Sequence, residues 1–420
     1  MSGKQVVIIG GGFAGLQAAR SLGRERRVDV TVLDRNNHYV FQPMLYQVAT
    51  AALSPTEIAT PIRGVLAGYP NVTVLQAEVT SVDPGRSTVT AGNMALSYDY
   101  LVAAAGAENN YFGHDDWRGP APGLKSLFDA VTIRDRLLRA FERAECEPDP
   151  DERQRLLTFL IIGGGYTGVE LAGAVAELAR YTLARDFRRI HPELARVVLV
   201  ETGRRLLPAM SEPLAAYAAK VLESLKVEVW TGVSASEVRD AGAVIGGRHV
   251  PSATVLWAAG VRPSGLSRFL GVSVDDQGRV PVQPDLSIDG HAELFVVGDL
   301  ARCPARDGTP LPALAPVAMQ QGRHVARMIR ADLDGKPRRP FRYWNKGELA
   351  AIGRNRAVGF VGGVSVRGLK AWLIWVFVHI YYLSDFRNRL IVMLQWSWTY
   401  LANSRGARLI MRGESGAAEG

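Results

Sequence analysis

Two glycine-rich turns in this chain share one spacing. The first is the segment 10–15 (GGGFAG) after the apolar run 6–9, and the second is 163–168 (GGGYTG) after the run 159–162. In such a turn the first glycine permits a tight bend, the second lets a phosphate group approach the backbone, and the third lets the next helix pack on the strand. The N-terminus of that helix favours negative charge. Each turn therefore predicts a site for the pyrophosphate of a dinucleotide.

A carboxylate ends the strand that follows each turn. Asp34 closes the expected strand 28–33, and Glu201 closes the expected strand 197–200. A carboxylate at this place accepts hydrogen bonds from ribose hydroxyl groups. Glu201 would also repel a 2′-phosphate, which predicts NADH rather than NADPH, although the neighbouring Arg204 and Arg205 leave room for a phosphate.

Two dinucleotide sites in one chain indicate a resident flavin, FAD, and a diffusing hydride donor, NADH. Gly298 and Asp299 follow the apolar run 295–297, and a carboxylate there can reach the sugar-alcohol chain of a flavin. The sequence separation from Gly163 to Glu201 is longer than usual, and we expect one extended helix through Ile190 to fill it.

The elements around the two turns repeat as well. The segments 98–106 and 254–260 are both strands that end in glycine, which extends the apparent duplication, and the runs 72–75 and 88–90 predict a small antiparallel insertion. The acidic, proline-containing stretch 144–152 is typical of an exposed connection. We predict an α/β fold of two dinucleotide-binding, Rossmann-like domains, the NADH domain inserted in the FAD domain, followed by an aromatic-rich C-terminal segment. The expected domains are an FAD-binding domain at 1–115 and 285–336, an NADH-binding domain at 150–265 and a C-terminal region at 337–420.

Composition limits the alternatives. The 420 residues suffice for two or three domains, and 47% hydrophobic with 21% charged residues is typical of a globular protein. The two cysteines, Cys146 and Cys303, form neither a CxxC pair nor a metal-ligand set, so we expect no metal. The net charge of +8 favours an acidic partner without choosing one. The N-terminus lacks the order of regions of a signal peptide, which predicts a cytosolic location.

The segments 10–15, 39–46 (YVFQPMLY), 163–173, 297–299 and 317–322 (VAMQQG) together resemble type II NADH dehydrogenases. The resemblance covers essentially the whole chain. It implies a single-chain, FAD-dependent NADH:quinone oxidoreductase that does not pump protons, with transfer of hydride from NADH to FAD and two-electron reduction of a membrane quinone. The cysteine pairs that a disulfide reductase or a sulfide:quinone reductase needs are not recognisable, which argues against both of these enzymes.

The resemblance implies roles for single residues. Glu170 corresponds to a glutamate near the nicotinamide and quinone, with a helix-stabilising first-turn glutamate as the alternative. Gln320 corresponds to the second of two quinone-binding glutamines, whereas Pro316 replaces the first, and a capping role for Gln320 stays open. The cofactor-binding residues that we predict are Gly10, Gly12, Phe13, Ala14, Gly15, Asp34, Arg35, Val79, Gly106, Gly298, Asp299, Pro316 and Val317, with Gly163, Gly165, Tyr166, Thr167, Gly168, Glu201 and Gly260.

The C-terminal segment combines aromatic and basic residues. Its apolar run 371–383 has 13 residues, too few to span a bilayer, which takes about 20. Tryptophan and arginine favour the headgroup layer, so the segment predicts peripheral binding to an anionic surface, the cytoplasmic face of the inner membrane. A buried dimer or interdomain helix is the competing interpretation, and we expect no nucleic acid. The residues concerned are Trp372, Trp375, Trp396, Trp398, Arg367, Lys370, Arg387, Arg389, Arg405, Arg408 and Arg412, and His379 on the same helical face is expected to be a packing residue.

Two other functions remain open from the residues alone. One is a soluble NADH reductase that passes electrons to a small acidic redox protein. The other is a flavoprotein interaction module that responds to NADH without turnover.

Overall fold

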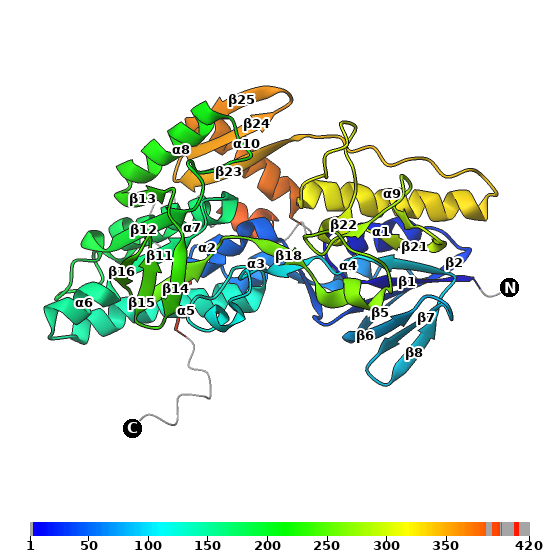
Figure 1. Cartoon of the computed structure of the whole chain (residues 1–420), viewed down its shortest axis with the longest axis horizontal. Coiled ribbons are helices and arrows are strands. Elements are labelled where there is room, and N and C mark those ends of the chain that lie inside the picture. Colours follow the sequence, from blue (N-terminus) through cyan, green and yellow to red (C-terminus); the bar gives the residue numbers. More distant parts are fainter. Residues whose placement is uncertain (1–2, 384–388, 395, 397–406, 411–420) are drawn as a thin grey trace. The chain divides into compact units, whose positions relative to one another are not determined.

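The computed structural model describes residues 3–383, 389–394, 396 and 407–410. The chain forms two compact units (Figure 1). Unit 1 consists of residues 1–40, 60–108 and 261–346, and unit 2 consists of residues 41–59, 109–260 and 347–420. The acidic stretch 144–152 therefore lies inside unit 2. Four short strands, all at or close to the points where the chain passes from one unit to the other, are β3 (His38–Val40), β4 (Ala59–Pro61), β10 (Ala107–Asn109) and β18 (Val261–Pro263).

A six-stranded sheet forms the centre of unit 1. It is parallel from β21 to β5, and β20 adds an antiparallel edge. The first four residues of the apolar run after Gln5 are buried on both faces, as expected for a central parallel strand. In spatial order the strands are β20 (Ser287–Ile288), β21 (His291–Val296), β9 (Tyr100–Ala103), β1 (Lys4–Ile9), β2 (Val28–Asp34) and β5 (Val72–Gln76).

The helices of unit 1 include α1 (Phe13–Leu22), α4 (Ile62–Leu66) and α9 (Ala315–Leu333). Helix α9 lies along α1, and a side chain at Gly322 would overlap the backbone of Ala14 (Figure 1). The antiparallel sheet of this unit consists of β6 (Val79–Asp83), β7 (Thr88–Ala91) and β8 (Met94–Ser97), and a small parallel pair consists of β19 (Val280–Pro281) and β22 (Ala301–Arg302).

The predicted antiparallel insertion is only half right. The run 88–90 belongs to β7 of that antiparallel sheet, but the run 72–75 belongs to β5 and pairs with β2 in parallel. The reason is the connection, since α4 carries the chain back across the sheet before β5 begins, and a crossover of this kind makes neighbouring strands parallel.

Unit 2 repeats the parallel sheet on a smaller scale. Its four strands pair in parallel throughout, with β11 in the middle between β12 and β17. In spatial order they are β13 (Val227–Thr231), β12 (Arg196–Glu201), β11 (Thr158–Ile162) and β17 (Thr254–Trp257). The two antiparallel sheets of this unit contain β14 (Ala235–Arg239), β15 (Gly242–Ile245) and β16 (Arg248–Pro251), and β23 (Gly347–Gly353), β24 (Arg356–Val361) and β25 (Val364–Arg367).

The α-helices of unit 2 come from all three of its chain segments. They are α2 (Leu45–Ala49), α3 (Pro55–Ile58), α5 (Leu127–Cys146), α6 (Pro150–Leu156), α7 (Tyr166–Glu177), α8 (Glu212–Ser224) and α10 (Gly368–Tyr382). None of the described helices has both the length and the apolar character that a bilayer crossing requires. Of the C-terminal residues singled out above, Arg387, Trp398, Arg405 and Arg412 lie outside the described residues.

The expectation of one helix through Ile190 is wrong. Helix α7 ends at Glu177 and continues only as a wider π-helical turn to Leu183. Beyond it, the Glu145 carboxylate at the end of α5 accepts hydrogen bonds from the backbone N–H groups of Arg188, Arg189 and Ile190, each at 3.0 Å. These N–H groups are therefore satisfied by a side chain instead of by a helix.

Candidate active site

The first glycine turn joins β1 to α1 in unit 1. Gly10 has φ +103°, and a side chain there would overlap the Ala104 carbonyl, so only glycine fits. A side chain at Gly15 would overlap the Gly10 carbonyl oxygen. Beside Gly12, in contrast, no heavy atom lies within 4 Å of the position that a Cβ would take. Neighbouring atoms thus leave no room for a side chain at Gly10 and Gly15, whereas the space beside Gly12 is open to an approaching phosphate.

Asp34 fixes this turn from the end of β2. One carboxylate oxygen accepts a hydrogen bond from the Gly11 N–H at 2.7 Å, and the other accepts one from the Asn36 N–H, also at 2.7 Å. Each carboxylate oxygen has a second lone pair for a ribose hydroxyl. Arg35 is exposed just beyond. The open glycine, the helix N-terminus and this carboxylate form the donor and acceptor set that an adenine dinucleotide such as FAD needs.

The strand that ends at Gly298 is held by a residue that sequence reasoning missed. Gly298 has φ +72°, and its N–H donates a 2.7 Å hydrogen bond to Oε1 of the buried Gln321. Gln321 is the neighbour of Gln320 in the segment 317–322. The two glutamines differ in burial, which the sequence alone does not show. Gln321 fixes the backbone next to Asp299.

Gln320 turns to another partner. Its side-chain amide donates a 3.0 Å hydrogen bond to the Trp344 carbonyl and accepts one from the Trp344 N–H, also at 3.0 Å. This reciprocal pair of hydrogen bonds joins α9 to the segment before β23. Its contact with a quinone stays a prediction.

The other predicted residues of unit 1 lie on several elements. Phe13 and Ala14 begin α1, and the Phe13 ring packs edge-on against Tyr39 at 5.4 Å between centroids. The remaining positions are Val79 at the start of β6, Gly106 with φ +68° after β9, and Pro316 and Val317 in the first turn of α9.

The second glycine turn repeats the first in unit 2. Gly163 has φ +115° and its Cβ would overlap Ala258, a side chain at Gly168 would overlap the Gly163 carbonyl oxygen, and the space beside Gly165 is open to 4 Å. Glu201 accepts hydrogen bonds from the N–H groups of Gly164 and Gly203, each at 2.6 Å. The carboxylates at the ends of β2 and β12 therefore play the same part. Gly260 follows β17, at the same edge of the sheet.

Tyr166 and Thr167 are the first residues of α7. The Tyr166 hydroxyl donates a hydrogen bond to the carboxylate of Glu348 on β23. Burial, together with the hydrogen bond to Glu348 and the negative charge of that carboxylate, raises the pKa of the Tyr166 phenol, so it stays protonated. Sequence reasoning did not find Glu348, because its partner lies 182 residues away.

Glu170 stands one turn further along α7. Glu170 is partly exposed because it lines a pocket, but protein atoms surround its carboxyl group. This burial raises the pKa of Glu170 to about 8. A 3.3 Å hydrogen bond from the Ala351 N–H acts in the opposite direction and is too weak to compensate. The carboxyl is consequently mostly protonated at neutral pH.

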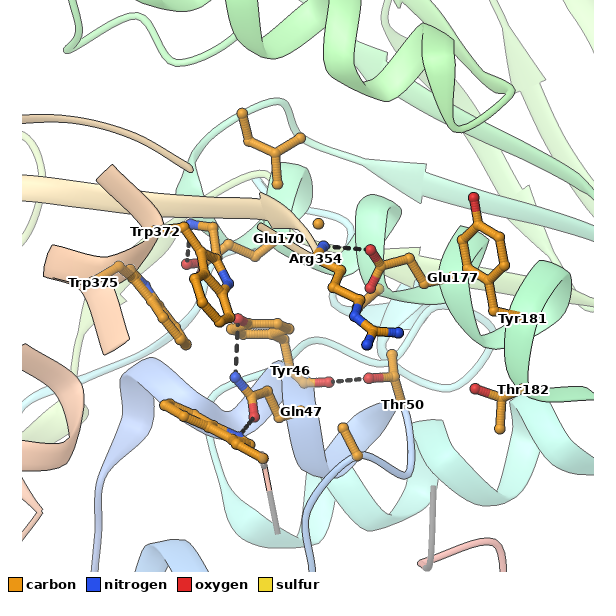
Figure 2. Close-up of a pocket in the computed structure, with 16 residues that line it drawn as sticks. Tyr46, Gln47, Thr50, Glu170, Glu177, Tyr181, Thr182, Arg354, Trp372 and Trp375 are labelled. Atoms are coloured by element: carbon orange, nitrogen blue, oxygen red, sulfur yellow. Dashed lines mark hydrogen bonds between the residues drawn. The ribbon is translucent and has the colours of Figure 1, made fainter. Parts of the chain in front are cut away.

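The pocket beside Glu170 lies wholly inside unit 2 and has a volume of about 150 Å³ (Figure 2). Glu177 and Arg354 lie toward one end, where the Arg354 N–H donates a hydrogen bond to the Glu177 carboxylate. Indole rings line the other end. The lining residues labelled in Figure 2 are Tyr46, Gln47, Thr50, Glu170, Glu177, Tyr181, Thr182, Arg354, Trp372 and Trp375, and Trp396 lines the pocket as well.

A chain of polar and aromatic contacts stiffens the indole end. Gln47 accepts a 2.9 Å hydrogen bond from Trp396 Nε1 and donates one of 3.1 Å to the Tyr46 hydroxyl. The Trp375 ring stacks on Trp396 at 5.3 Å and on His379 at 4.1 Å. His379 donates to the Trp375 carbonyl at 2.7 Å, and burial lowers its pKa to about 4, which agrees with a packing residue.

Comparison with known proteins gives the family. Residues 4–322 match the model of the pyridine nucleotide-disulphide oxidoreductases. The chain is 43% identical to the type II NADH:quinone oxidoreductase Ndh of Mycobacterium tuberculosis, over 96% of this chain and 89% of the relative, and 31% identical to that of Staphylococcus haemolyticus, over 88% and 92%. The chain belongs to the type II NADH:quinone oxidoreductases.

The fold of this type II oxidoreductase agrees with a solved one. NDH2 from Plasmodium falciparum, in complex with NADH, superposes with a TM-score of 0.88 at 18% identity, covering 97% of this chain and all of that one. The predicted α/β class with two Rossmann-like units is thereby confirmed. The membrane-associating function of the C-terminal segment stays a prediction.

Proposed function

We propose that this chain oxidises NADH and reduces a quinone by two electrons, with FAD as the resident carrier. The observation that carries the proposal is the pair of glycine turns, each open at its second glycine and each fixed by a carboxylate, together with the family to which the chain belongs. In the overall reaction NADH, one proton and a quinone give NAD⁺ and a quinol. The chain therefore has to bind two dinucleotides and supply one proton.

The turn of unit 1 suits FAD and the turn of unit 2 suits NADH. The N–H groups at the starts of α1 and α7 would face the two pyrophosphates, and Asp34 and Glu201 would accept from the adenosine ribose hydroxyls. Gln321 keeps the Gly298 backbone in place for contact with the flavin side of the cofactor. Bound FAD supplies the chemistry, accepting a hydride and giving up two electrons, which no side chain of this protein can do.

The pocket beside Glu170 is the place that we assign to the quinone. Its indole walls suit a flat apolar ring, and the protonated carboxyl of Glu170 holds a proton at pH 7 where a quinone oxygen can take it. Arg354 and Glu177 give the other end of the pocket its polar character. Glu170 would regain its proton from solvent after each turnover.

Helix α10 suits peripheral binding to an anionic membrane surface. Leu369, Leu373, Phe377 and Tyr381 repeat every four residues and are 54–71% exposed, whereas Trp375 and His379 on the other side are buried. Arg367 and Lys370 are exposed at the start of the helix. Such an apolar stripe with basic residues at its end favours the headgroup layer, here of the cytoplasmic face of the inner membrane. A homodimer that covers this stripe is the alternative.

The function is tested with the purified flavoprotein under anaerobic conditions. NADH should bleach the flavin absorbance, and addition of a quinone in lipid vesicles should restore it within the time of turnover. Reduction that persists after quinone addition, while a small acidic redox protein restores the absorbance, would refute quinone as the acceptor.

A further inference from the structure

We propose that Phe112 binds the nicotinamide half of NADH, as an aromatic wall at the end of β17. The inference rests on the proposed function for the identity of the dinucleotide. Phe112 is unusual in two ways, since its backbone has φ +52° and its side chain is 62% exposed. A bulky residue rarely adopts such a left-handed conformation, and strain of this kind is concentrated at functional sites.

The strained conformation is enforced by its neighbours. Asn110 accepts a 2.9 Å hydrogen bond from the Phe112 N–H through its side chain, and its own N–H donates to the Gly260 carbonyl at 3.1 Å. The Asn110 carbonyl accepts from Trp257 Nε1 at 2.8 Å. Two of these hydrogen bonds attach Asn110 to the end of β17, and the third holds the Phe112 backbone against the Asn110 side chain.

Buried aromatic rings support the segment from behind. Tyr111 is fully buried, stacks on Trp257 with 5.2 Å between ring centroids, and donates from its hydroxyl to the Ala121 carbonyl at 2.9 Å. The Phe112 ring lies 6.4 Å from the Trp257 ring. One aromatic residue is consequently packed into the core while its neighbour is held out into solvent.

The Phe112 ring covers the backbone that follows β17. Its Cζ atom lies 3.0 Å from the position that a Cβ on Gly260 would take. Gly260 has an ordinary φ, so it is this ring, and not the backbone conformation, that disfavours a side chain there. The exposed ring therefore lies at the carboxyl edge of the parallel sheet.

That edge is where a dinucleotide crosses unit 2. The strands β12 and β17 lie on opposite sides of β11, so the connections after β11 and β12 and those after β17 diverge there, and open α/β sheets bind ligands at such a point. With the adenosine ribose at Glu201 after β12 and the pyrophosphate at Gly165 after β11, the other half of the molecule extends toward β17. Phe112 presents an exposed ring on that side, and a planar nicotinamide ring can pack against its face or edge.

The test separates the two halves of the dinucleotide. ADP-ribose contains the adenosine, the pyrophosphate and a second ribose but lacks the nicotinamide ring. For Phe112→Ala we expect the KM for NADH to rise about tenfold, whereas the inhibition constant of ADP-ribose against NADH stays within about twofold of its wild-type value. Phe112→Tyr keeps the ring and should restore the wild-type KM.

A matched control and a folding control accompany these variants. Phe128 is 78% exposed in the first turn of α5, and Phe128→Ala should leave both constants unchanged. Thermal melting of the holoenzyme should show that Phe112→Ala stays folded, and Phe112→Leu, which keeps the bulk but not the aromatic ring, provides a second variant. An unchanged KM for NADH, or an equal rise in both constants, would overturn the proposal. A wild-type protein whose flavin NADH does not reduce would instead refute the proposed function.

Discussion

The hydroxyl group of Tyr166 and the carboxylate of Glu348 are hydrogen-bonded, and this contact ties the first turn of α7 to β23. Gly173 lets α7 and β23 pack closely together, because a side chain at this position would overlap the Ile352 carbonyl. The start of helix α7, where the second glycine turn passes into the helix, is therefore stabilised by a strand that comes much later in the chain.

Removal of this hydrogen bond should cost stability. Because the acceptor is charged and half-buried, we expect Tyr166→Phe to lower the free energy of unfolding by about 1–3 kcal/mol. Glu348→Gln should lower it less, because an amide oxygen still accepts. Urea denaturation of the two single variants and the double variant gives the coupling energy, and strictly additive effects would show that the two side chains do not interact.

The two kinds of glycine in the first turn should respond differently to alanine. Gly15→Ala forces a side chain into the Gly10 carbonyl, so the protein should lose folding yield. Gly12→Ala meets no atom within 4 Å and should fold, but its methyl group occupies the space of a phosphate, so the flavin content per chain should fall several-fold. The flavin-to-protein absorbance ratio measures this, and a full flavin content in Gly12→Ala would contradict the assignment.

The same comparison applies to the second turn. Gly165→Ala should keep its flavin and raise the KM for NADH, because the open position there faces the other dinucleotide. Loss of flavin in Gly165→Ala with an unchanged KM would exchange the roles of the two turns.

Glu170 should give stability and turnover a dependence on pH. Its pKa rises from 4.5 in the unfolded chain to about 8 in the fold, so between these values the folded state keeps a proton that the unfolded state has lost. Stability from this group is fully present below pH 4.5 and is lost as the pH rises toward 8, by at most about 1.4 kcal/mol per pH unit. Glu170→Gln cannot titrate, and its stability should fall less over this range in denaturation measured at several pH values.

The kinetic counterpart concerns only the quinone step. In the wild type the rate of flavin reoxidation by quinone should fall above pH 8, while the rate of flavin reduction by NADH should not follow the same profile. Stopped-flow measurement of the two half-reactions separates them. A Glu170→Gln variant with an unchanged profile for the quinone step would remove Glu170 from proton delivery.

The exposed stripe of α10 should decide membrane binding. Phe377 is 71% exposed, and Phe377→Glu should lower partition onto anionic vesicles about tenfold or more, since a buried aromatic side chain contributes about 1.5–3 kcal/mol. Phe128→Glu is the matched control, because Phe128 on α5 is also a highly exposed aromatic residue. Vesicle sedimentation at low and high salt separates the apolar contribution from the electrostatic one. Equal binding of the two variants would favour the homodimer for this face.

The sequence was sufficient where the chemistry depends on neighbours along the chain. The turn 10–15, its carboxylate Asp34 and the helix and strand between them follow from spacing alone, because strand, turn and helix are local. Gln321, Glu348 and Phe112 depend instead on segments that approach each other only in the fold, or on a backbone angle that the residue type disfavours. The helix expected through Ile190 failed for the same reason, since Glu145 on a distant helix takes up the backbone donors there.

The equivalence of the two glycine turns has a consequence for how the cofactors are told apart. Both turns are closed, opened and fixed at corresponding positions, down to the carboxylate that accepts from the second residue of each. Nothing in that shared frame distinguishes a ligand that remains through thousands of turnovers from one that departs after each. The difference in residence time must therefore depend on residues around the turns. If the two hexapeptides are exchanged, each dinucleotide should keep its own lifetime on the protein.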